Sequence, residues 1–220
     1  MKVRSTKPAV ASAVDLKLVA GELCLDFVNT IEWHASDHPI ELLRNYGDIV
    51  AWGRRVRILD PAAGNRLLRE ARIDPVQAAV VLERAIEIRE TIYRVALACT
   101  RRQAPVPADL EGFNRELKAT LRHVRVTPGP RGLTWTWDPD DRQLDSVLWP
   151  ILRSAAELLT SERQQRIGQC ADDRGCGWLF LDNTKNHSRR WCEMNDCGNR
   201  AKARRHYQRS RAARLPRKQP

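Results

Sequence analysis

Four cysteines near the C-terminal end of the 220-residue chain have the residue type and spacing of a metal site. The pattern is C-x5-C-x15-C-x4-C, formed by Cys170, Cys176, Cys192 and Cys197. If the six cysteines of the chain were spread evenly, the stretch 170–197 would hold about one of them. Zinc binds four thiolates at the corners of a tetrahedron. The x4 pair has the usual spacing of a zinc knuckle, and the x5 pair is one residue longer. We therefore predict Zn²⁺ at these four thiols. Free or disulfide-bonded thiols, or His187 as a ligand in place of one cysteine, are the alternatives.

Basic residues are concentrated in the same part of the chain. Residues 1–162 carry 23 Lys/Arg against 22 Asp/Glu, a net charge of +1, whereas residues 163–220 carry 15 against 5, or +10. This imbalance predicts a polyanionic partner for the C-terminal part alone, and a solvated cationic tail is the simpler alternative. The candidates for nucleic-acid contact are Arg189, Arg190, Arg200, Lys202, Arg204, Arg205, Arg209 and Arg211.

A basic helix is expected directly after the last cysteine. Gly198 permits a tight backbone turn at the metal ligand, and Asn199 can cap the helix that follows. The sequence contains no acidic residue from Arg200 to Arg214. A helix this basic repels itself unless an anion lies beside it, and a metal-anchored helix can place arginines along a phosphate backbone. Between the cysteine pairs, Trp178 and Phe180 are expected to cover the metal site from one side of a short strand.

Three polar residues stand among apolar ones in a segment that must be buried. Asp26, Asn29 and Thr30 lie in the run LCLDFVNT, and buried polar groups need partners. Capping and turn bonds to backbone amides are the simpler interpretation, and a small-molecule pocket lined by these groups is the functional one. Cys24 and His34 could be imagined as a nucleophile and its base, but nothing in the sequence brings them together.

Helical periodicity dominates the first three quarters of the chain. We expect helices opening at Pro39, over residues 62–73, from Val76 to about Arg102, over 108–121, and over 144–159 with a break at Pro150. In the longest helix the core stripe is predicted to begin at Val76 and to include Val80 and Tyr93. A second set of residues is expected to widen it to a broad apolar face: Leu82, Ala85, Ile88, Ile92, Val95 and Ala96. Cys99, near its end, is expected in the core. Alternation at residues 124–137 predicts a β-hairpin whose aromatic residues pack on the helices or line a ligand site.

Other features of the sequence limit the class of protein. No apolar run is long enough to cross a membrane, and residues 1–15 resemble a disordered start rather than a signal peptide. Cysteines without a secretory signal favour the reducing cytoplasm. The chain offers no nucleophile–base set and no phosphate-binding loop, and four thiolates would leave a metal no open position, so an enzyme is not expected.

The motif around the cysteines resembles a known family. The run CGWLFLDNTKNHSRRWCEMNDCGNRAKARRHY resembles the bacterial CGNR zinc-finger proteins, named for the tetrapeptide found here at Cys197-Gly198-Asn199-Arg200. The hexapeptide LDFVNT, residues 25–30, resembles the start of that family's first domain, called ABATE. The resemblance spans residues 16–212, and the loop 183–186 departs from the family's serine-containing loop. It implies a zinc site at the four cysteines and a stress-related transcription regulator, and an RNA-binding role has also been suggested for the family.

Taken together, these observations predict two folded parts. A mainly α domain with one β-hairpin (α+β), at 16–162 with the hairpin at 123–138, precedes a small treble-clef or ribbon-like zinc finger at 163–214 that ends in a basic helix, with a tail at 215–220. The expected function is DNA-binding transcription regulation, with a first domain that senses a small-molecule effector or mediates homodimerisation. An RNA-binding zinc protein and a zinc-stabilised protein-interaction module are the alternatives.

Overall fold

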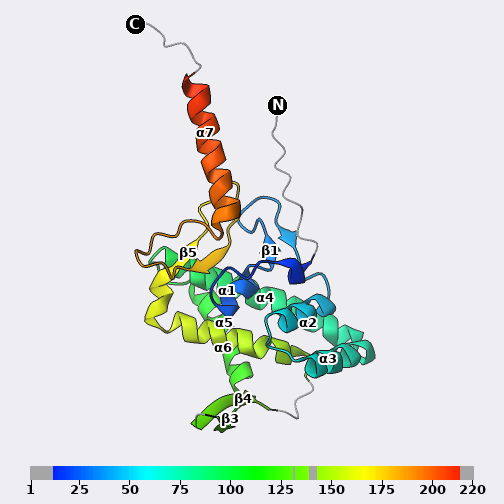
Figure 1. The fold of residues 1–220 in the computed structure, drawn as a ribbon. Coiled ribbons are helices and arrows are strands. Elements are labelled where there is room, and N and C mark those ends of the chain that lie inside the picture. Colours follow the sequence, from blue (N-terminus) through cyan, green and yellow to red (C-terminus); the bar gives the residue numbers. More distant parts are fainter. Residues whose placement is uncertain (1–11, 131, 139–142, 214–220) are drawn as a thin grey trace.

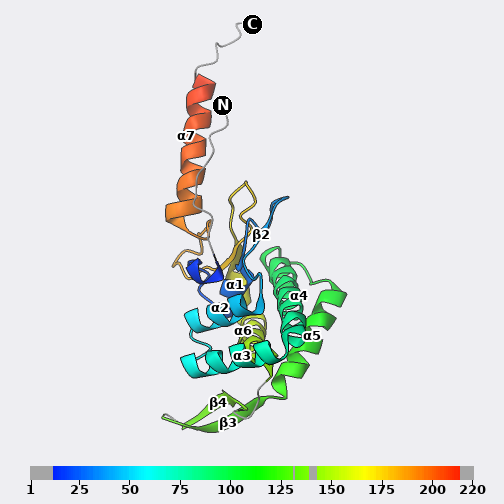
Figure 2. The same ribbon diagram turned by 90° about the vertical axis from the view of Figure 1, so that its right-hand side faces the viewer.

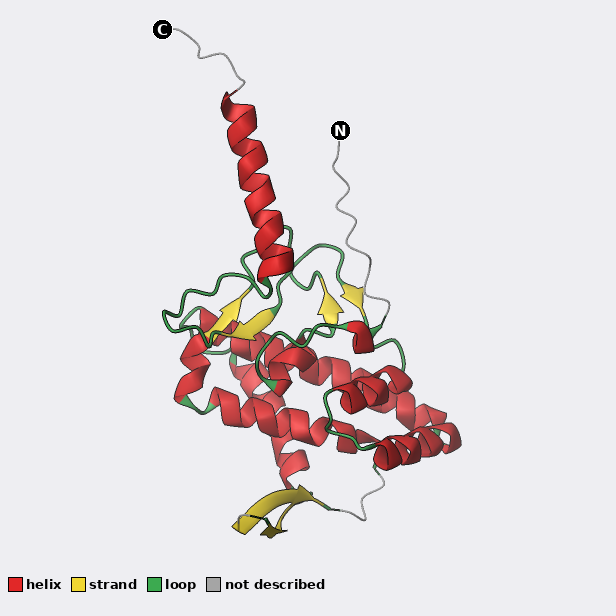
Figure 3. Cartoon of the chain, viewed as in Figure 1, coloured by secondary structure: helices red, strands yellow, loops and turns green. Residues whose placement is uncertain are grey.

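The computed structural model describes residues 12–130, 132–138 and 143–213, and it shows a mostly helical body from which two elements project (Figures 1 and 2). The last helix leaves the body at one end and a β-hairpin leaves it at the other (Figure 3). The helices are α1 Leu23–Val28, α2 Tyr46–Arg55, α3 Pro61–Ile73, α4 Pro75–Thr100, α5 Pro107–Leu121, α6 Trp149–Leu159 and α7 Asn199–Ala213. The predicted fold class, a mainly α domain with a hairpin and a finger ending in a basic helix, is confirmed.

Short elements connect these helices. Single turns form at η1 Ala13–Asp15, η2 Leu144–Leu148, η3 Glu162–Arg166 and η4 Met194–Gly198. The strands make three antiparallel pairs: β1 Ile31–Glu32 with β2 Ile40–Glu41, β3 Val124–Gly129 with β4 Gly132–Trp137, and β5 Ile167–Gln169 with β6 Leu179–Leu181. Among the described helices, none combines the length and apolar character needed to cross a bilayer.

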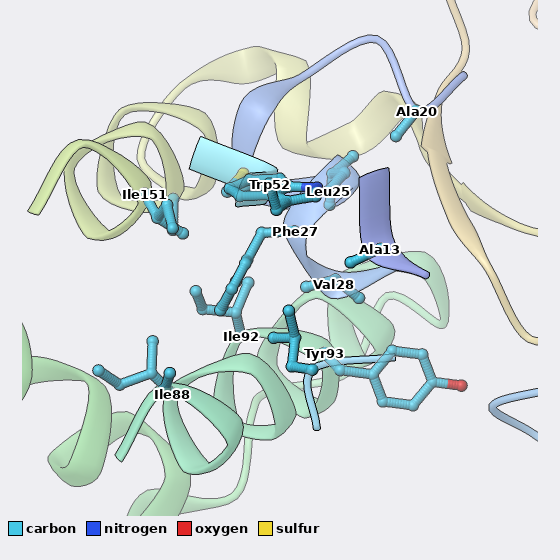
Figure 4. Close-up of a cluster of buried hydrophobic side chains, with 14 of the residues drawn as sticks. Ala13, Ala20, Leu25, Phe27, Val28, Trp52, Ile88, Ile92, Tyr93 and Ile151 are labelled. Carbon is cyan, nitrogen blue, oxygen red and sulfur yellow. The ribbon is translucent and has the colours of Figure 1, made fainter. Parts of the chain in front are cut away.

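The core forms where α4 lies against α1, α2 and α5, with α6 packed on α1 and α5. Leu25, Phe27 and Trp52 are fully buried there, and the rings of Phe27 and Trp52 lie 5.3 Å apart (Figure 4). Ile88 and Ile92 of α4 face this cluster. The same buried cluster continues into β6 and the four cysteines, so the finger and the helical domain share one core.

Local signals fix several helix starts. The Asp74 carboxylate accepts a 2.8 Å hydrogen bond from the Gln77 amide, and Pro75 occupies the first helical position of α4. Asp60 and Pro61 start α3 in the same way. Pro150 lies at the first turn of α6, immediately after η2, so the predicted break is confirmed.

The predicted apolar face of α4 is only partly right. Ala85, Ile88, Ile92, Val95 and Ala96 are buried as predicted, but Val76 and Val80 are 74% and 49% exposed, and Val81, which was not included, is buried. Apolar residues surround the first half of this helix almost completely, so their spacing alone could not identify the side that faces the core. Tyr93, by contrast, is buried as predicted.

The helix predicted to open at Pro39 starts later. Ile40 and Glu41 pair with β1, and α2 begins only at Tyr46, where the Asn45 side chain accepts a hydrogen bond from the Asp48 amide. The Glu41 carboxylate accepts bonds from the Leu42 and Leu43 amides and also binds a buried arginine of α4. These contacts hold the segment extended, and local propensity did not reveal them.

The hairpin forms as predicted, but its apolar face is largely open. Val126 lies opposite Trp135, and the two are 53% and 58% exposed. Leu133 is 78% exposed. At the base of the hairpin the Trp137 ring lies 5.8 Å from that of Trp149, and the Arg153 guanidinium of α6 lies 5.1 Å from the Trp135 ring centroid. The expectation that its aromatics pack on the helices therefore holds in part.

The predicted disorder of residues 1–15 does not hold at its end. Ala13–Asp15 form η1, and Ala13 is buried against the core because neighbouring Leu16 anchors the segment there. Residues 1–11 and the predicted tail at 215–220 lie outside the described residues.

Candidate metal centre and nucleic-acid interface

The four cysteines predicted as ligands come together. The Sγ atoms of Cys170, Cys176, Cys192 and Cys197 all lie within 4.8 Å of one another, and all four residues are buried. The Cys176–Cys192 and Cys192–Cys197 sulfur pairs are 3.7 and 3.5 Å apart. Four sulfurs bound to one zinc at ~2.3 Å lie about 3.8 Å apart at the corners of a tetrahedron. None of the four is in a disulfide, and the set fits a thiolate-bound metal ion.

The electrostatics of the cluster also favour a bound cation. Hydrogen bonding from Cys176 and the other two thiols lowers the pKa of Cys170. The pKa values of Cys192 and Cys197 are raised, mainly through their hydrogen bonds with Cys170. Four thiolates this close repel one another in a buried site, and a divalent ion that they share removes the repulsion.

The first knuckle, residues 170–177, depends on two glycines for its conformation and is hydrogen-bonded to the helical domain. Gly175 and Gly177 have φ values of +90° and +70°, which disfavour a side chain. A Cβ atom on Gly177 would lie 2.6 Å from the Ala35 amide nitrogen. The His34 and Ala35 amides donate 3.1 Å hydrogen bonds to the carbonyls of Cys176 and Gly175. The loop after β1 therefore fixes the position of the knuckle.

Both aromatic residues predicted to cover this site are buried, in the same apolar cluster as the four cysteines. The indole N–H of Trp178 donates a 2.8 Å hydrogen bond to the Ile31 carbonyl. The guanidinium of Arg189 lies 4.3 Å from the ring centroid of Phe180. These contacts join the finger to the strand β1 and to its own basic loop.

Two of the predicted nucleic-acid contacts are engaged inside the protein. The Arg189 guanidinium donates to the carbonyls of Val19, Leu181, Trp191 and Cys192. Arg200 donates to Asp172 at 2.7 Å and to the Cys197 sulfur at 2.8 Å, and it also pairs with Asp196. These contacts stabilise the finger and give no support to the prediction that either residue binds nucleic acid.

The acidic partners of these arginines were missed from the sequence. Burial works against the charged form of Asp172, but hydrogen bonds from Arg200 and from the Arg174 amide hold its pKa below the usual value. Neighbouring Asp173 pairs with Arg204 of α7. The sequence did offer a signal for these ion pairs. Asp172 and Asp173 are adjacent acids in an otherwise basic segment, where nearby arginines are available as partners.

The remaining basic residues of α7 face solvent. Lys202, Arg205 and Arg209 are exposed and form no ion pair with any described residue. Their spacing of three and four residues places them on one side of the helix. The guanidinium groups of Arg205 and exposed Arg190 lie 6.0 and 5.1 Å from the centroid of the Trp191 ring. The cationic face of α7 therefore continues onto the loop of the finger that carries Arg190. Arg211 is exposed on another side.

Comparison with family models assigns both parts of the chain. The ABATE model, described as "Putative stress-induced transcription regulator", matches residues 21–162. The CGNR zinc-finger model matches residues 166–210. The chain belongs to the ABATE family. Neither description names an enzyme, and a search of curated proteins found no match.

The polar residues of the ABATE hexapeptide bind other parts of the protein. Asp26 accepts a 3.0 Å bond from the Ala20 amide. The Asn29 amide bonds to both the amide and the carbonyl of Leu179, each at 2.9 Å, and so joins the ABATE domain to the CGNR finger. The Thr30 hydroxyl donates to the Phe27 carbonyl. The structure thus gives these residues the capping and bridging contacts of the simpler interpretation, and the ligand pocket gains no support from them.

A buried ion network in the ABATE domain was not predicted. Arg89, 1% exposed, binds the carboxylates of Glu41 and Glu90, and Glu90 also lies 2.8 Å from His34. His34 is thus engaged here rather than with Cys24. Burial raises the pKa of the Cys24 thiol to about 12, which suppresses its reactivity. His187 is exposed and belongs to no potential metal-binding group within the described residues.

Proposed function

We propose that this protein is a zinc-dependent DNA-binding transcription regulator, in which the CGNR finger presents α7 to the DNA backbone. The proposal rests mainly on one observation: α7 stands clear of the body with a solvent-exposed cationic face (Figures 1 and 2). We assign Zn²⁺ to Cys170, Cys176, Cys192 and Cys197. Thiolate ligands persist where thiols stay reduced, so we place the protein in the cytoplasm.

The metal would fix the direction of the helix. Cys197 lies in η4, and α7 begins two residues later, so its base is tied to the cluster through one of the ligands. Arg200 and Arg204 attach the first turns of α7 to Asp172 and Asp173 of the first knuckle. A bound zinc ion would hold both knuckles together and thereby keep the helix pointing away from the body.

Phosphate contact would come from the exposed face. Lys202, Arg205 and Arg209 can follow a phosphate backbone, with Arg190 and Arg211 as further contacts at its edges. These contacts supply affinity and orientation. Sequence selection would need base contacts from the same helix inside a groove.

The test uses the zinc-loaded full-length protein. Elemental analysis should find one zinc per chain, and selection from a randomised duplex pool should enrich a sequence motif. Removing the metal with a chelator should abolish binding, and adding zinc should restore it. Metal-free protein that binds the selected duplex with undiminished affinity would refute zinc-dependent recognition. Failure to enrich any motif would refute sequence-specific regulation.

RNA is the second candidate because an aromatic side chain lies among the basic ones. Tyr207 on α7 is 64% exposed, and exposed aromatic rings stack on unpaired bases. Competition between the selected duplex and a structured RNA decides between the two. Stronger binding to RNA, lost on Tyr207→Ala, would favour the RNA interpretation.

A further inference from the structure

A cavity of about 780 Å³ lies between helices of the ABATE domain and η3, and its described lining includes none of the hexapeptide residues 25–30. Its walls come from the end of α4, from α5, from the end of α6 and from η3. Phe113, Leu117 and Leu159 provide apolar surface, and Phe113 is only 6% exposed. The volume lies within the ~300–1,000 Å³ of small-molecule sites.

The polar groups of this cavity are almost all uncharged. Asn114, Thr160 and Gln164 offer amide and hydroxyl groups, and the Cys99 thiol lies 3.6 Å from the Gln164 side-chain oxygen. Burial raises the pKa of Cys99, so this thiol stays neutral. Among the described residues that line the cavity, Arg102 is the one with a charged side chain, and it is exposed. An ionised ligand would lose its hydration here without gaining a buried counter-charge.

One wall of the cavity continues directly into the finger. Gln164 and Gln165 belong to η3, which is followed by β5 and then by Cys170. The Arg166 carbonyl accepts a 2.8 Å bond from the Asp182 amide of the finger. A molecule that packs on η3 therefore lies against the segment that carries the first metal ligand.

We propose that this cavity is a binding site for an uncharged small molecule with an apolar body and one or two hydrogen-bonding groups. Such a molecule would place its apolar part on Phe113, Leu117 and Leu159. Its polar group would meet Gln164 at the wall next to the finger or Asn114 on α5. The volume and the mainly apolar, neutral lining favour a small molecule over a protein segment.

The probe for the test is N-phenyl-1-naphthylamine, a neutral apolar dye whose fluorescence rises in apolar surroundings. Titration into the full-length zinc-loaded protein should saturate at one dye per chain. Ala156→Phe, which fills the cavity from α6, should weaken binding at least tenfold. Ala62→Phe, at an exposed position of α3, is the matched control and should leave the affinity unchanged. Equal affinities in the two variants, or no saturable binding, would overturn the proposal.

Hydrogen exchange on the unaltered protein keeps the test independent of the folding of the variants. Bound dye should slow amide exchange in residues 95–103, 110–117 and 156–165, which contribute to the cavity walls. Protection confined to other segments, such as the exposed hairpin face, would show that the dye binds elsewhere and would overturn the assignment.

Discussion

Replacing the exposed cations of α7 should remove a defined part of the electrostatic affinity for DNA. Lys202, Arg205 and Arg209 share one side of the helix and form no ion pair among the described residues, so each is available for a phosphate. Each phosphate contact lowers the slope of log affinity against log salt by about 0.9. The triple alanine variant should therefore lose about 2.7 from the magnitude of that slope. At ~0.15 M salt, relative to a 1 M reference, this corresponds to roughly 160-fold weaker binding, or about 3 kcal/mol.

The assay is fluorescence anisotropy with a labelled duplex at several salt concentrations between about 0.05 and 0.3 M. Alanine is a strong helix former and the replaced side chains are exposed, so the variant should fold normally. The control removes the same charge elsewhere, by replacing Arg69, Lys118 and Arg122 on exposed positions of α3 and at the end of α5. If both variants shift the slope equally, only net charge matters and α7 is not the binding element.

Three further predictions concern the metal site and the ABATE domain. Cys192→Ser should reduce bound zinc to a trace and lower the melting temperature, whereas Cys99→Ser should retain the metal; elemental analysis and thermal scans measure both. Burial raises the pKa of Asp26 to about 6, so the folded state holds this proton more tightly and stability falls as pH rises through that value. The unfolding free energy of Asp26→Asn minus that of the wild type should therefore increase by about 1.4 kcal/mol as the pH rises from about 5 to 8. Urea unfolding at several pH values measures this difference, and a difference that does not change with pH would contradict the prediction. Arg89→Met leaves Glu41 and Glu90 without their buried cation and should cost ~3–5 kcal/mol, against under ~1 kcal/mol for Arg94→Met on the exposed side of α4; equal losses in urea unfolding would refute the role of burial.

Local chemistry made much of this protein predictable. Asp74 and Pro75 start a helix through bonds within one turn, and Pro150 breaks one because it lacks an amide hydrogen, so both features could be inferred without tertiary structure. The start of α2 was misplaced because Glu41 is held by Arg89, 48 residues away. No short-range pattern reports such a contact.

The candidate binding face was predicted only in outline. The basic composition of α7 is evident from the sequence, but Arg204 pairs with Asp173 while adjacent Arg205 points to solvent. Neighbours on a helix are about 100° apart, so only the position of the acidic knuckle decides which arginine is neutralised. The cavity beside η3 was also out of reach, because two stretches distant in the sequence, 95–117 and 156–165, line it together.

The sequence alone determined that four thiols with knuckle spacing precede an arginine-rich helix, because ligand type, spacing and charge are properties of a short segment. Tertiary structure decided the rest. In the folded chain Asn29 bonds to Leu179 and joins the ABATE domain to the CGNR finger. Arg189 and Arg200 bind groups within the protein, whereas one side of α7 is exposed to solvent. The physical reason is that burial and charge pairing depend on which distant groups meet, and only the folded chain brings them together.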